Sequence, residues 1–251
     1  MPADNMLAGR LALITGAGGG IGRALVAAFQ AAGARVVACD RAAPDVAADF
    51  HAGFDVTDAA ACREALARIT AAAGLPDIVV SNAGGTDADT LEALSDAQWA
   101  HEIALNLDSA RYLTAPLLPA MRARGSGALV FVASVNALAH FNGPAYSAAK
   151  AGLLAYMRAI AVECAAQGIR ANAICPGTVR TPAWAERVAR KPDMLARISR
   201  LYPRGRVVEP AEVAQAAVFL AGDMASAITG VALPVDAGLM AGNMPFWQEI
   251  G

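Results

Sequence analysis

The stretch LALITGAGGGIG, residues 11–22, decides the fold of this chain. Its first five residues are apolar or β-branched and predict a buried strand, and TGAGGGIG (15–22) follows that strand and opens a long helical stretch. Gly16, Gly20 and Gly22 stand where a backbone must turn tightly and approach a diphosphate. A strand, a glycine turn and a helix in this order predict that a dinucleotide binds where the helix begins.

Short apolar runs recur along the rest of the chain, with Ala-rich helical stretches between them. The runs lie at residues 35–40, 77–84, 128–134, 169–177 and 228–238, and a weaker one lies near 50–54. This alternation predicts crossover units and a parallel sheet. We therefore expect one domain over residues 1–251, an α/β Rossmann-type doubly wound sheet of about seven parallel strands with helices on both faces. Residues 181–206 exceed the connection that is needed there and predict a lid over the substrate.

The composition excludes several classes of protein. The 251 residues are 56% hydrophobic and 17% charged, which is typical of a globular protein, and a net charge of −2 with scattered basic residues argues against a nucleic-acid partner. The apolar runs are too short to span a membrane and the first ten residues lack a signal-peptide pattern, so we expect a cytoplasmic protein without a membrane partner. The four cysteines form no CxxC pair and no cluster with histidine, which predicts reduced, mostly buried thiols and no metal.

Asp40 predicts the identity of the dinucleotide. It ends the second strand, 24 residues after Gly16, near the spacing at which a carboxylate accepts hydrogen bonds from the adenosine ribose. Such a carboxylate repels a 2′-phosphate and favours NAD over NADP, whereas an arginine at position 41 could pair with that phosphate. Asp55 has two interpretations: it accepts from the adenine amino group, or it caps the helix that follows.

Tyr146 and Lys150 are four residues apart in a helical stretch at 145–166, so their side chains project from one face. A phenol with a pKa of about 10 is a poor base at neutral pH, but a neighbouring ammonium and a cationic nicotinamide both stabilise the phenolate. Tyr146 is therefore expected to be a general acid/base. Ser134, 12 residues before it at the end of a strand, is expected to hydrogen-bond the substrate oxygen.

The chain resembles the single-domain short-chain dehydrogenases/reductases over nearly its whole length. The resemblance rests on TGxxxGxG at 15–22, SNAG at 81–84, YxxxK at Tyr146 and Lys150, and PGTVRTP at 176–182, all in the family's order. It implies that Lys150 also holds the nicotinamide ribose and that Asn106 completes the catalytic set by positioning a water. The cofactor contacts that we expect, from the motifs and the resemblance together, are Gly16, Gly20, Ile21, Gly22, Asp40, Arg41, Asp55, Val56, Asn82, Ala83, Gly84, Tyr146, Lys150, Pro176, Gly177, Val179 and Thr181. The chain departs from the family at Ser81, where asparagine is more usual, and at Ala237, where many members carry glycine.

The loop between Ser134 and Tyr146 must pass over the substrate if both flanking residues touch it. Its candidates for specificity are Asn136, His140, Phe141 and Asn142, although His140 can also be read as an exposed loop histidine. Trp184 and Trp247 either close an apolar wall of the pocket or pack in the core. Such a mixed pocket suits a secondary alcohol, which can be a polyol, a sugar-like compound or a hydroxy acid.

Two helices, expected at about 97–124 and 145–166, carry apolar residues on more than one face, which predicts burial against another subunit. These residues are Leu113, Leu117, Leu118, Met121, Leu153, Leu154, Tyr156 and Met157. The resemblance implies a tetramer, because members of the family commonly assemble through these two helices, and the apolar tail at 238–247 is a candidate for a second interface. We therefore expect a homotetramer.

The leading functional hypothesis is an NAD-dependent alcohol dehydrogenase. A 3-oxoacyl thioester reductase is the nearest alternative, which Asp40 disfavours because those reductases usually take NADPH. A non-catalytic dinucleotide-sensing regulator is disfavoured because Ser134, Tyr146 and Lys150 are all present.

Overall fold

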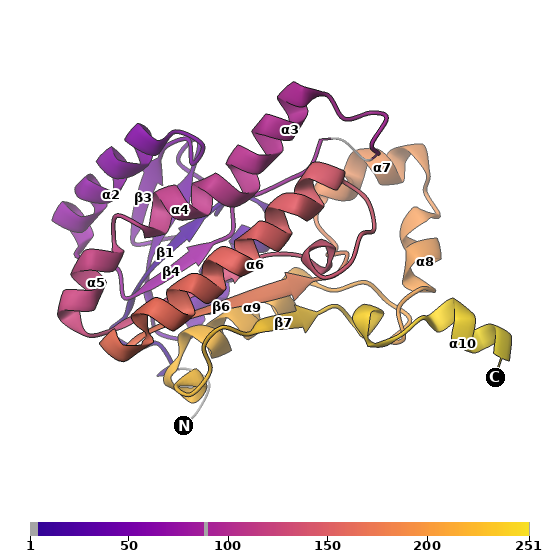
Figure 1. The fold of residues 1–251 in the computed structure, drawn as a ribbon. Helices are drawn as coiled ribbons and strands as arrows, with labels where there is room; N and C mark the ends of the chain where they lie inside the picture. Colours follow the sequence, from indigo (N-terminus) through magenta and orange to yellow (C-terminus); the bar gives the residue numbers. More distant parts are fainter. Residues whose placement is uncertain (1–4, 88–89, 251) are drawn as a thin grey trace.

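A parallel sheet of seven strands forms the centre of the protein, in the order β3-β2-β1-β4-β5-β6-β7 (Figure 1). The structure is a computed structural model and describes residues 5–87 and 90–250. The strands are β1 (Leu11–Thr15), β2 (Arg35–Asp40), β3 (Phe50–Gly53), β4 (Ile78–Ser81), β5 (Gly127–Val132), β6 (Ile169–Pro176) and β7 (Ala232–Val235). The prediction of a doubly wound sheet is confirmed, including the weak strand near residue 50. The strand order reverses between β1 and β4, and a ligand crevice is expected at such a point.

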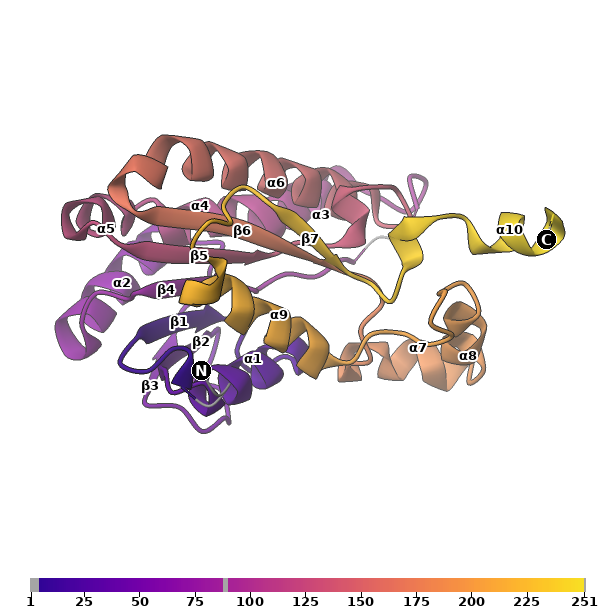
Figure 2. The ribbon, with the colours of Figure 1, turned by 90° about the horizontal axis from the view of Figure 1, so that it is seen from below.

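Helices cover both faces of the sheet, as Figure 2 shows. One face carries α1 (Gly20–Ala31) and α9 (Pro210–Ala221), and the other carries α2 (Ala59–Ala73), α3 (Asp96–Ile103), α4 (Ser109–Thr114), α5 (Leu118–Arg124) and α6 (Pro144–Cys164). Successive strand residues belong to opposite cores: Leu13 packs under α2, α4 and α6, and Ile14 packs under α1 and α9. Burial on both faces explains why the central strands are continuous apolar runs.

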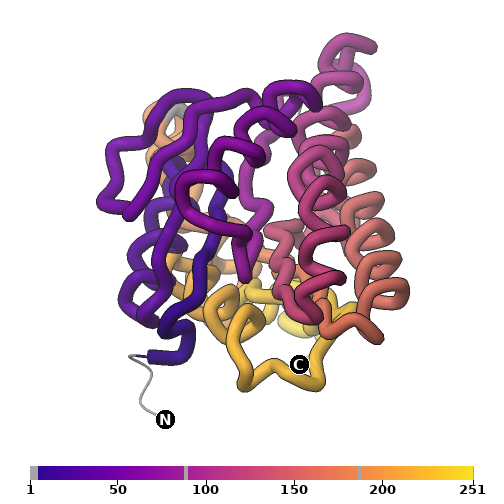
Figure 3. The backbone as a smooth tube through the Cα atoms, turned by 90° about the vertical axis from the view of Figure 1, so that its left-hand side faces the viewer, coloured from indigo at the N-terminus to yellow at the C-terminus, as the bar shows by residue number. Residues whose placement is uncertain are grey.

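The segment 97–124 is not the single helix that we expected. A π-helical turn at Ala104–Asp108 separates α3 from α4, and the side-chain amide of Asn106 donates to the Glu102 carbonyl at 2.9 Å. A second break, at residues 115–117, precedes α5, because Pro116 and Pro119 have no N–H to donate to the preceding turn. Of the two expected helices, α6 forms as one piece, and it lies beside α3 and the π-helical turn (Figures 1 and 3).

The apolar residues on which we based a second subunit lie inside the protomer. Leu113, Leu117, Met121, Leu153, Leu154 and Met157 are buried, and Leu118 and Tyr156 pack against the same core. They therefore leave no surplus apolar surface, and that argument for assembly is wrong. On α6 the exposed large apolar side chain is Val162, which is 81% exposed.

The carboxyl ends of the strands are bordered by the predicted lid segment, residues 181–206, which contains α7 (Ala185–Arg190) and α8 (Met194–Ser199) (Figures 1 and 2). The helix α10 (Met244–Ile250) projects from the body at the same end.

The four cysteines are buried free thiols, as predicted. Within residues 5–87 and 90–250, no three His, Cys, Asp or Glu side chains gather into a possible metal site. None of the helices in this part of the chain has the length and apolar character needed to cross a bilayer.

Candidate active site

The turn between β1 and α1 leaves no room for side chains at two of its glycines. A β carbon on Gly22 would collide with the Gly16 carbonyl oxygen, and one on Gly20 would lie 2.8 Å from the Thr181 side chain. Gly16 itself has a φ of 63°, which favours glycine. No side chain caps the N–H groups of the first turn of α1. Uncapped donors behind a bare glycine turn fit the diphosphate of a dinucleotide.

Asp40 lies at the carboxyl end of β2, against the glycine turn. Its Oδ2 accepts a hydrogen bond from the Gly18 N–H at 2.9 Å, and its Oδ1 accepts from the Arg41 N–H at 2.8 Å. The Arg41 side chain is exposed beside it. The Arg23 side chain, for which the sequence pattern predicted no role at the site, donates from Nε to the Gly18 carbonyl at 2.9 Å. Carboxylate and glycine turn are thus held together at the predicted ribose position.

Asp55 does not cap α2, so one of its two interpretations is wrong. Its Oδ1 accepts from the backbone N–H and the hydroxyl of Thr57, and these bonds lower the pKa of the Asp55 carboxyl below its ordinary value. The cap is Asp58, which accepts from the backbone N–H groups of residues 60 and 61. Val56 is buried in the core. Contact of Asp55 or Val56 with the adenine stays a prediction.

The segment after β4 is tied to the glycine turn through Asn82. Its Nδ2 donates to the Thr15 carbonyl at 2.9 Å and to the Gly16 carbonyl at 3.2 Å. The Thr15 hydroxyl accepts in return from the N–H groups of Asn82 and Ala83 at 3.1 and 3.2 Å. These four bonds fix the spacing between the ends of β1 and β4.

Asn106 holds the next part of the same segment. Its Nδ2 donates to the Gly85 carbonyl at 2.8 Å, and its Oδ1 accepts from the Gly85 N–H at 3.1 Å. A β carbon on Gly84 would lie 2.7 Å from Asn106 Oδ1 and 3.1 Å from Lys150 Nζ, which places the amide and the ammonium at the same glycine. The role of Asn106 in positioning a water stays a prediction.

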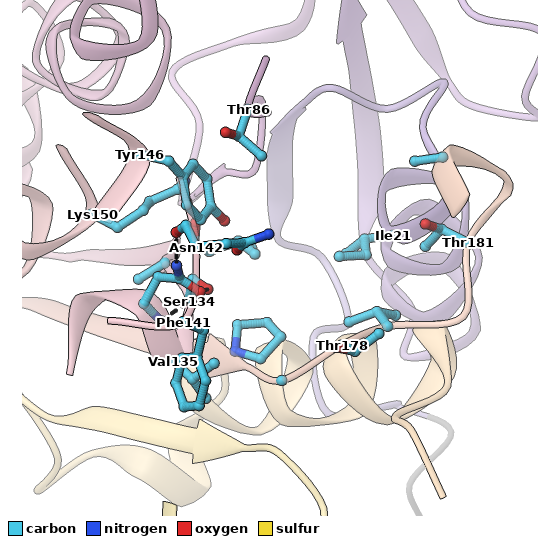
Figure 4. A pocket seen from close by; sticks show the side chains of 18 of the residues that line it. Ile21, Thr86, Ser134, Val135, Phe141, Asn142, Tyr146, Lys150, Thr178 and Thr181 are labelled. Carbon is cyan, nitrogen blue, oxygen red and sulfur yellow. Dashed lines mark hydrogen bonds between the residues drawn. The ribbon is translucent and has the colours of Figure 1, made fainter. Parts of the chain in front are cut away.

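Ser134, Tyr146 and Lys150 meet at one place, where β5 ends and α6 begins (Figure 4). Tyr146 is in the first turn of α6, and Lys150 Nζ lies 5.6 Å from the centroid of its ring, so the two side chains share one side of the helix. Lys150 Nζ donates to the Val132 carbonyl at 2.9 Å, and the Ser134 hydroxyl accepts from the Asn136 N–H at 3.1 Å.

Burial dominates the electrostatics of this site. It raises the pKa of the Tyr146 phenol above its ordinary value; a hydrogen bond with Ser134 opposes the rise, and the charges of Cys175 and Glu102 add to it. Burial also lowers the pKa of Lys150 to about 8. The expected lowering of the phenol pKa is therefore not found, because loss of water around the phenolate outweighs the hydrogen bond with Ser134.

A cavity of about 660 Å³ opens in front of these residues, within the size range of small-molecule sites. The predicted residues that line it are Ile21, Asn82, Gly84, Ser134, Asn136, Phe141, Asn142, Tyr146, Lys150, Pro176, Gly177, Val179, Thr181 and Trp184. The lining residues that we did not predict as site residues include Thr86, Thr178, Ile198, Leu201, Tyr202 and Leu239. Gly16, Gly20, Gly22, Asp40, Arg41, Asp55, Val56, Ala83 and Asn106 lie outside this lining.

Hydrogen bonds of Asn136 hold the loop between Ser134 and Tyr146, both within the loop and to the start of α6. Asn136 Nδ2 donates to the Asn142 carbonyl at 2.6 Å and to the Ser147 hydroxyl at 3.0 Å. His140 is exposed, with Nδ1 3.3 Å from Ser147 Oγ, and it does not line the cavity. The exposed-loop interpretation of His140 is therefore the one that holds. Trp247 is 62% exposed on α10 and neither packs in the core nor lines the cavity.

Tyr202 fastens the lid segment to the strand end below it. It is buried, and its hydroxyl accepts from the Thr178 N–H at 2.7 Å. Val208 adds a second tie, because it donates to the Thr178 carbonyl and accepts from the Arg180 N–H, both at 2.9 Å. The sequence signal for Tyr202 was a large aromatic residue within an insertion longer than the connection requires.

Known proteins are similar to this chain over nearly its whole length. The family described as enoyl-(acyl carrier protein) reductase matches residues 16–240. An acetoacetyl-CoA reductase of Rhizobium meliloti is 39% identical over 91% of this chain and 98% of its own. A galactitol 2-dehydrogenase (L-tagatose-forming) of Cereibacter sphaeroides is 37% identical, over 92% of this chain and 95% of its own. The crystal structure of an oxidoreductase from Burkholderia thailandensis superposes with a TM-score of 0.89 at 44% identity, covering 96% of both chains. The chain belongs to the short-chain dehydrogenase/reductase family, whose members are oxidoreductases that use nicotinamide dinucleotides.

Proposed function

We propose that the protein is an NAD-dependent dehydrogenase that interconverts a secondary alcohol and its ketone. The observation that carries the proposal is the convergence of Ser134, Tyr146 and Lys150 on one cavity beside the glycine turn. Relatives that act on a polyol and on an acetoacetyl thioester support a substrate with a secondary alcohol or ketone group.

Residues of this chain would hold the cofactor at both ends. The bare turn at Gly16–Gly22 and the uncapped start of α1 suit its diphosphate, and Asp40 suits the adenosine ribose. Thr181 and Lys150 line the cavity in which we place the nicotinamide half. When bound, the cofactor supplies or accepts the hydride. Asp40 favours NAD because its charge opposes a 2′-phosphate.

Tyr146 moves the proton in the proposed reaction. Because burial raises its pKa, the phenol is protonated at neutral pH and is ready to donate to a ketone oxygen. In the direction of oxidation the phenol must first lose its proton to solvent, and the phenolate then accepts the alcohol proton; a cation within the cavity stabilises that phenolate. The Ser134 hydroxyl lies beside it and donates to the same substrate oxygen, where negative charge develops.

Replacing Tyr146 by Phe tests the proposal. We expect turnover of secondary alcohols to fall by about 10²–10⁴-fold, because the proton has no other acceptor of this geometry. Binding of NADH, measured by its fluorescence, should stay within a factor of about two, since the diphosphate binds at the glycine turn and the phenol oxygen is one of many expected cofactor contacts. A Tyr146→Phe protein that retains full activity would rule out the acid/base role.

Assembly as a homotetramer remains part of the proposal and rests on the family resemblance. A cytoplasmic location also remains a proposal and rests on the short apolar runs of the sequence. Light scattering measures the first directly, and a monomeric mass of 25.6 kDa would refute it.

A further inference from the structure

The lid segment, residues 181–206, is strongly basic in a chain whose net charge is −2. It contains seven basic residues against two acidic ones, Glu186 and Asp193. The basic residues are Arg187, Arg190, Lys191, Arg197, Arg200, Arg204 and Arg206. Arg206 is neutralised by Glu212, with Nη2 to Oε1 at 2.7 Å, but the segment still keeps a clear positive charge at the mouth of the site. Positive charge of this kind is ordinary on a solvated surface, and what distinguishes this segment is the cavity beside its charged residues.

A second cavity lies under this charge. It has a volume of about 360 Å³ and is lined by Lys191, Met194, Arg197, Ile198 and Leu201, which we call the α8 groove. Three of these side chains are apolar and two are cations. Leu201 remains 47% exposed, an apolar surface that a ligand would cover.

The α8 groove continues the active-site cavity. Ile198 and Leu201 line both spaces, so a ligand can run from one to the other along this shared wall. Arg197 is within 4.0 Å of Asp193, but both side chains are more than 65% exposed, and such a pair is weak. Its guanidinium can therefore pair with an anion of the ligand.

The active-site cavity offers no such partner. Among the described residues that line it, Lys150 is the one cationic side chain, and its buried ammonium donates to the Val132 carbonyl. A carboxylate two or three bonds from the reacting carbon would lie there among neutral groups. The cations at Lys191 and Arg197 stand beyond the shared apolar wall, so the anionic group they suit must be joined to the reacting carbon by a long arm.

We propose that the α8 groove binds the phosphorylated arm of a carrier-linked substrate, of the coenzyme A thioester kind, with its phosphates at Lys191 and Arg197. The apolar wall of Ile198 and Leu201 covers the arm, and the reacting carbon reaches Tyr146. This rests on the proposed dehydrogenase function and narrows its substrate to a 3-hydroxyacyl or 3-oxoacyl thioester.

Binding of free coenzyme A tests the groove without turnover. Calorimetric titration is done on the full-length protein with saturating NADH, so that the dinucleotide site is filled and cannot take the adenosine of the probe. We compare the wild type with a Lys191→Gln/Arg197→Gln double variant. The control is an Arg63→Gln/Arg68→Gln double variant, which loses two exposed charges of α2, outside both cavities. The groove variant should bind roughly tenfold more weakly, since each exposed ion pair contributes about 0.2–1 kcal/mol. The control should bind as the wild type does.

A kinetic comparison identifies the source of the anion. The groove variant should show a KM about tenfold higher for 3-hydroxybutyryl-CoA, with an unchanged kcat, and no change for 3-hydroxybutyrate or butan-2-ol. An equal change for 3-hydroxybutyrate would replace the phosphorylated arm by a carboxylate and overturn the proposal. So would a wild type that does not bind coenzyme A, or a groove variant that binds it equally well. Failure of the dehydrogenase proposal looks different, because then none of the three substrates yields NADH while the titration still reports on the groove.

Discussion

Replacing Asp40 by Asn changes the charge at the ribose position with little change of shape. An amide oxygen at this place can still accept from the Gly18 N–H, now 2.9 Å from Oδ2, so the glycine turn should keep its position. What disappears is the negative charge that opposes a 2′-phosphate. We therefore expect Asp40→Asn to lose much of its preference for NAD over NADP.

The size of the effect follows from Coulomb's law. Two unit charges about 4 Å apart interact by about 1 kcal/mol in water, so a phosphate carrying nearly two charges is opposed by about 2 kcal/mol. Removing this term should improve kcat/KM for NADP by roughly 30-fold. For NAD the ribose loses a hydrogen bond to a charged acceptor and keeps a neutral one, a cost of about 1 kcal/mol, or roughly fivefold. The preference for NAD should fall by roughly 100-fold.

The assay is the initial rate of NADH or NADPH formation at low and high salt. High salt should reduce the discrimination in the wild type, because the opposing charges are partly exposed and are screened. Asp45→Asn is the matched control, since Asp45 is an exposed acid of the same loop whose side chain does not touch the glycine turn. An unchanged ratio in Asp40→Asn, or the same shift in Asp45→Asn, would refute the reasoning.

Two further predictions concern stability and pH. Ala237 has a φ of 52°, a left-handed conformation that costs a non-glycine residue about 1–2 kcal/mol. Ala237→Gly relieves this strain but increases the conformational entropy of the unfolded chain. The net effect should be a free energy of unfolding that is higher by about 0.5–1 kcal/mol. Thermal unfolding of Ala237→Gly should show a Tm higher by about 1–3 °C. The control, Ala67→Gly on the exposed face of α2, should lower the Tm. A lower Tm for Ala237→Gly would contradict the claim that the backbone of Ala237 is strained. The second concerns Glu102, which is 1% exposed and whose carboxylate raises the pKa of Tyr146 in addition to the larger effect of burial. Glu102→Gln keeps an oxygen that can accept from the Thr86 hydroxyl and the Asp87 N–H, but it removes the negative charge and so lowers the pKa of the phenol. The acidic limb of the pH profile for alcohol oxidation should therefore move to lower pH. A limb that stays in place would show that the charge of Glu102 does not affect the phenol.

Much of the site followed from local spacing. The four-residue interval from Tyr146 to Lys150 needs only one turn of helix to place both on one side, and α6 provides it. The collision that a side chain at Gly22 would cause is with Gly16, only six residues away, so the turn can be recognised from the motif. Strand β1 could also be predicted from the sequence, because a strand that is buried on both faces requires an unbroken apolar run.

Other features depended on contacts between distant segments. The residues next to Tyr202 in the sequence do not predict that its hydroxyl accepts a hydrogen bond from the Thr178 N–H. The exposure of His140 depends in the same way on the fold of its loop, which places its Nδ1 near Ser147. The direction of the Tyr146 pKa shift could not be predicted from the sequence of its helix. The largest cause of the shift is desolvation, which depends on all the elements that pack around the phenol.

Apolar pattern and glycine spacing sufficed for the parallel sheet, the dinucleotide turn and the tyrosine–lysine pair, because each depends on neighbours within a few turns of chain. The packing of the layers alone settled which apolar helix residues face the core, which loop residues face the cavity, and how far water is excluded from the phenol. Burial is a property of the assembled protein, and no short stretch of residues carries it.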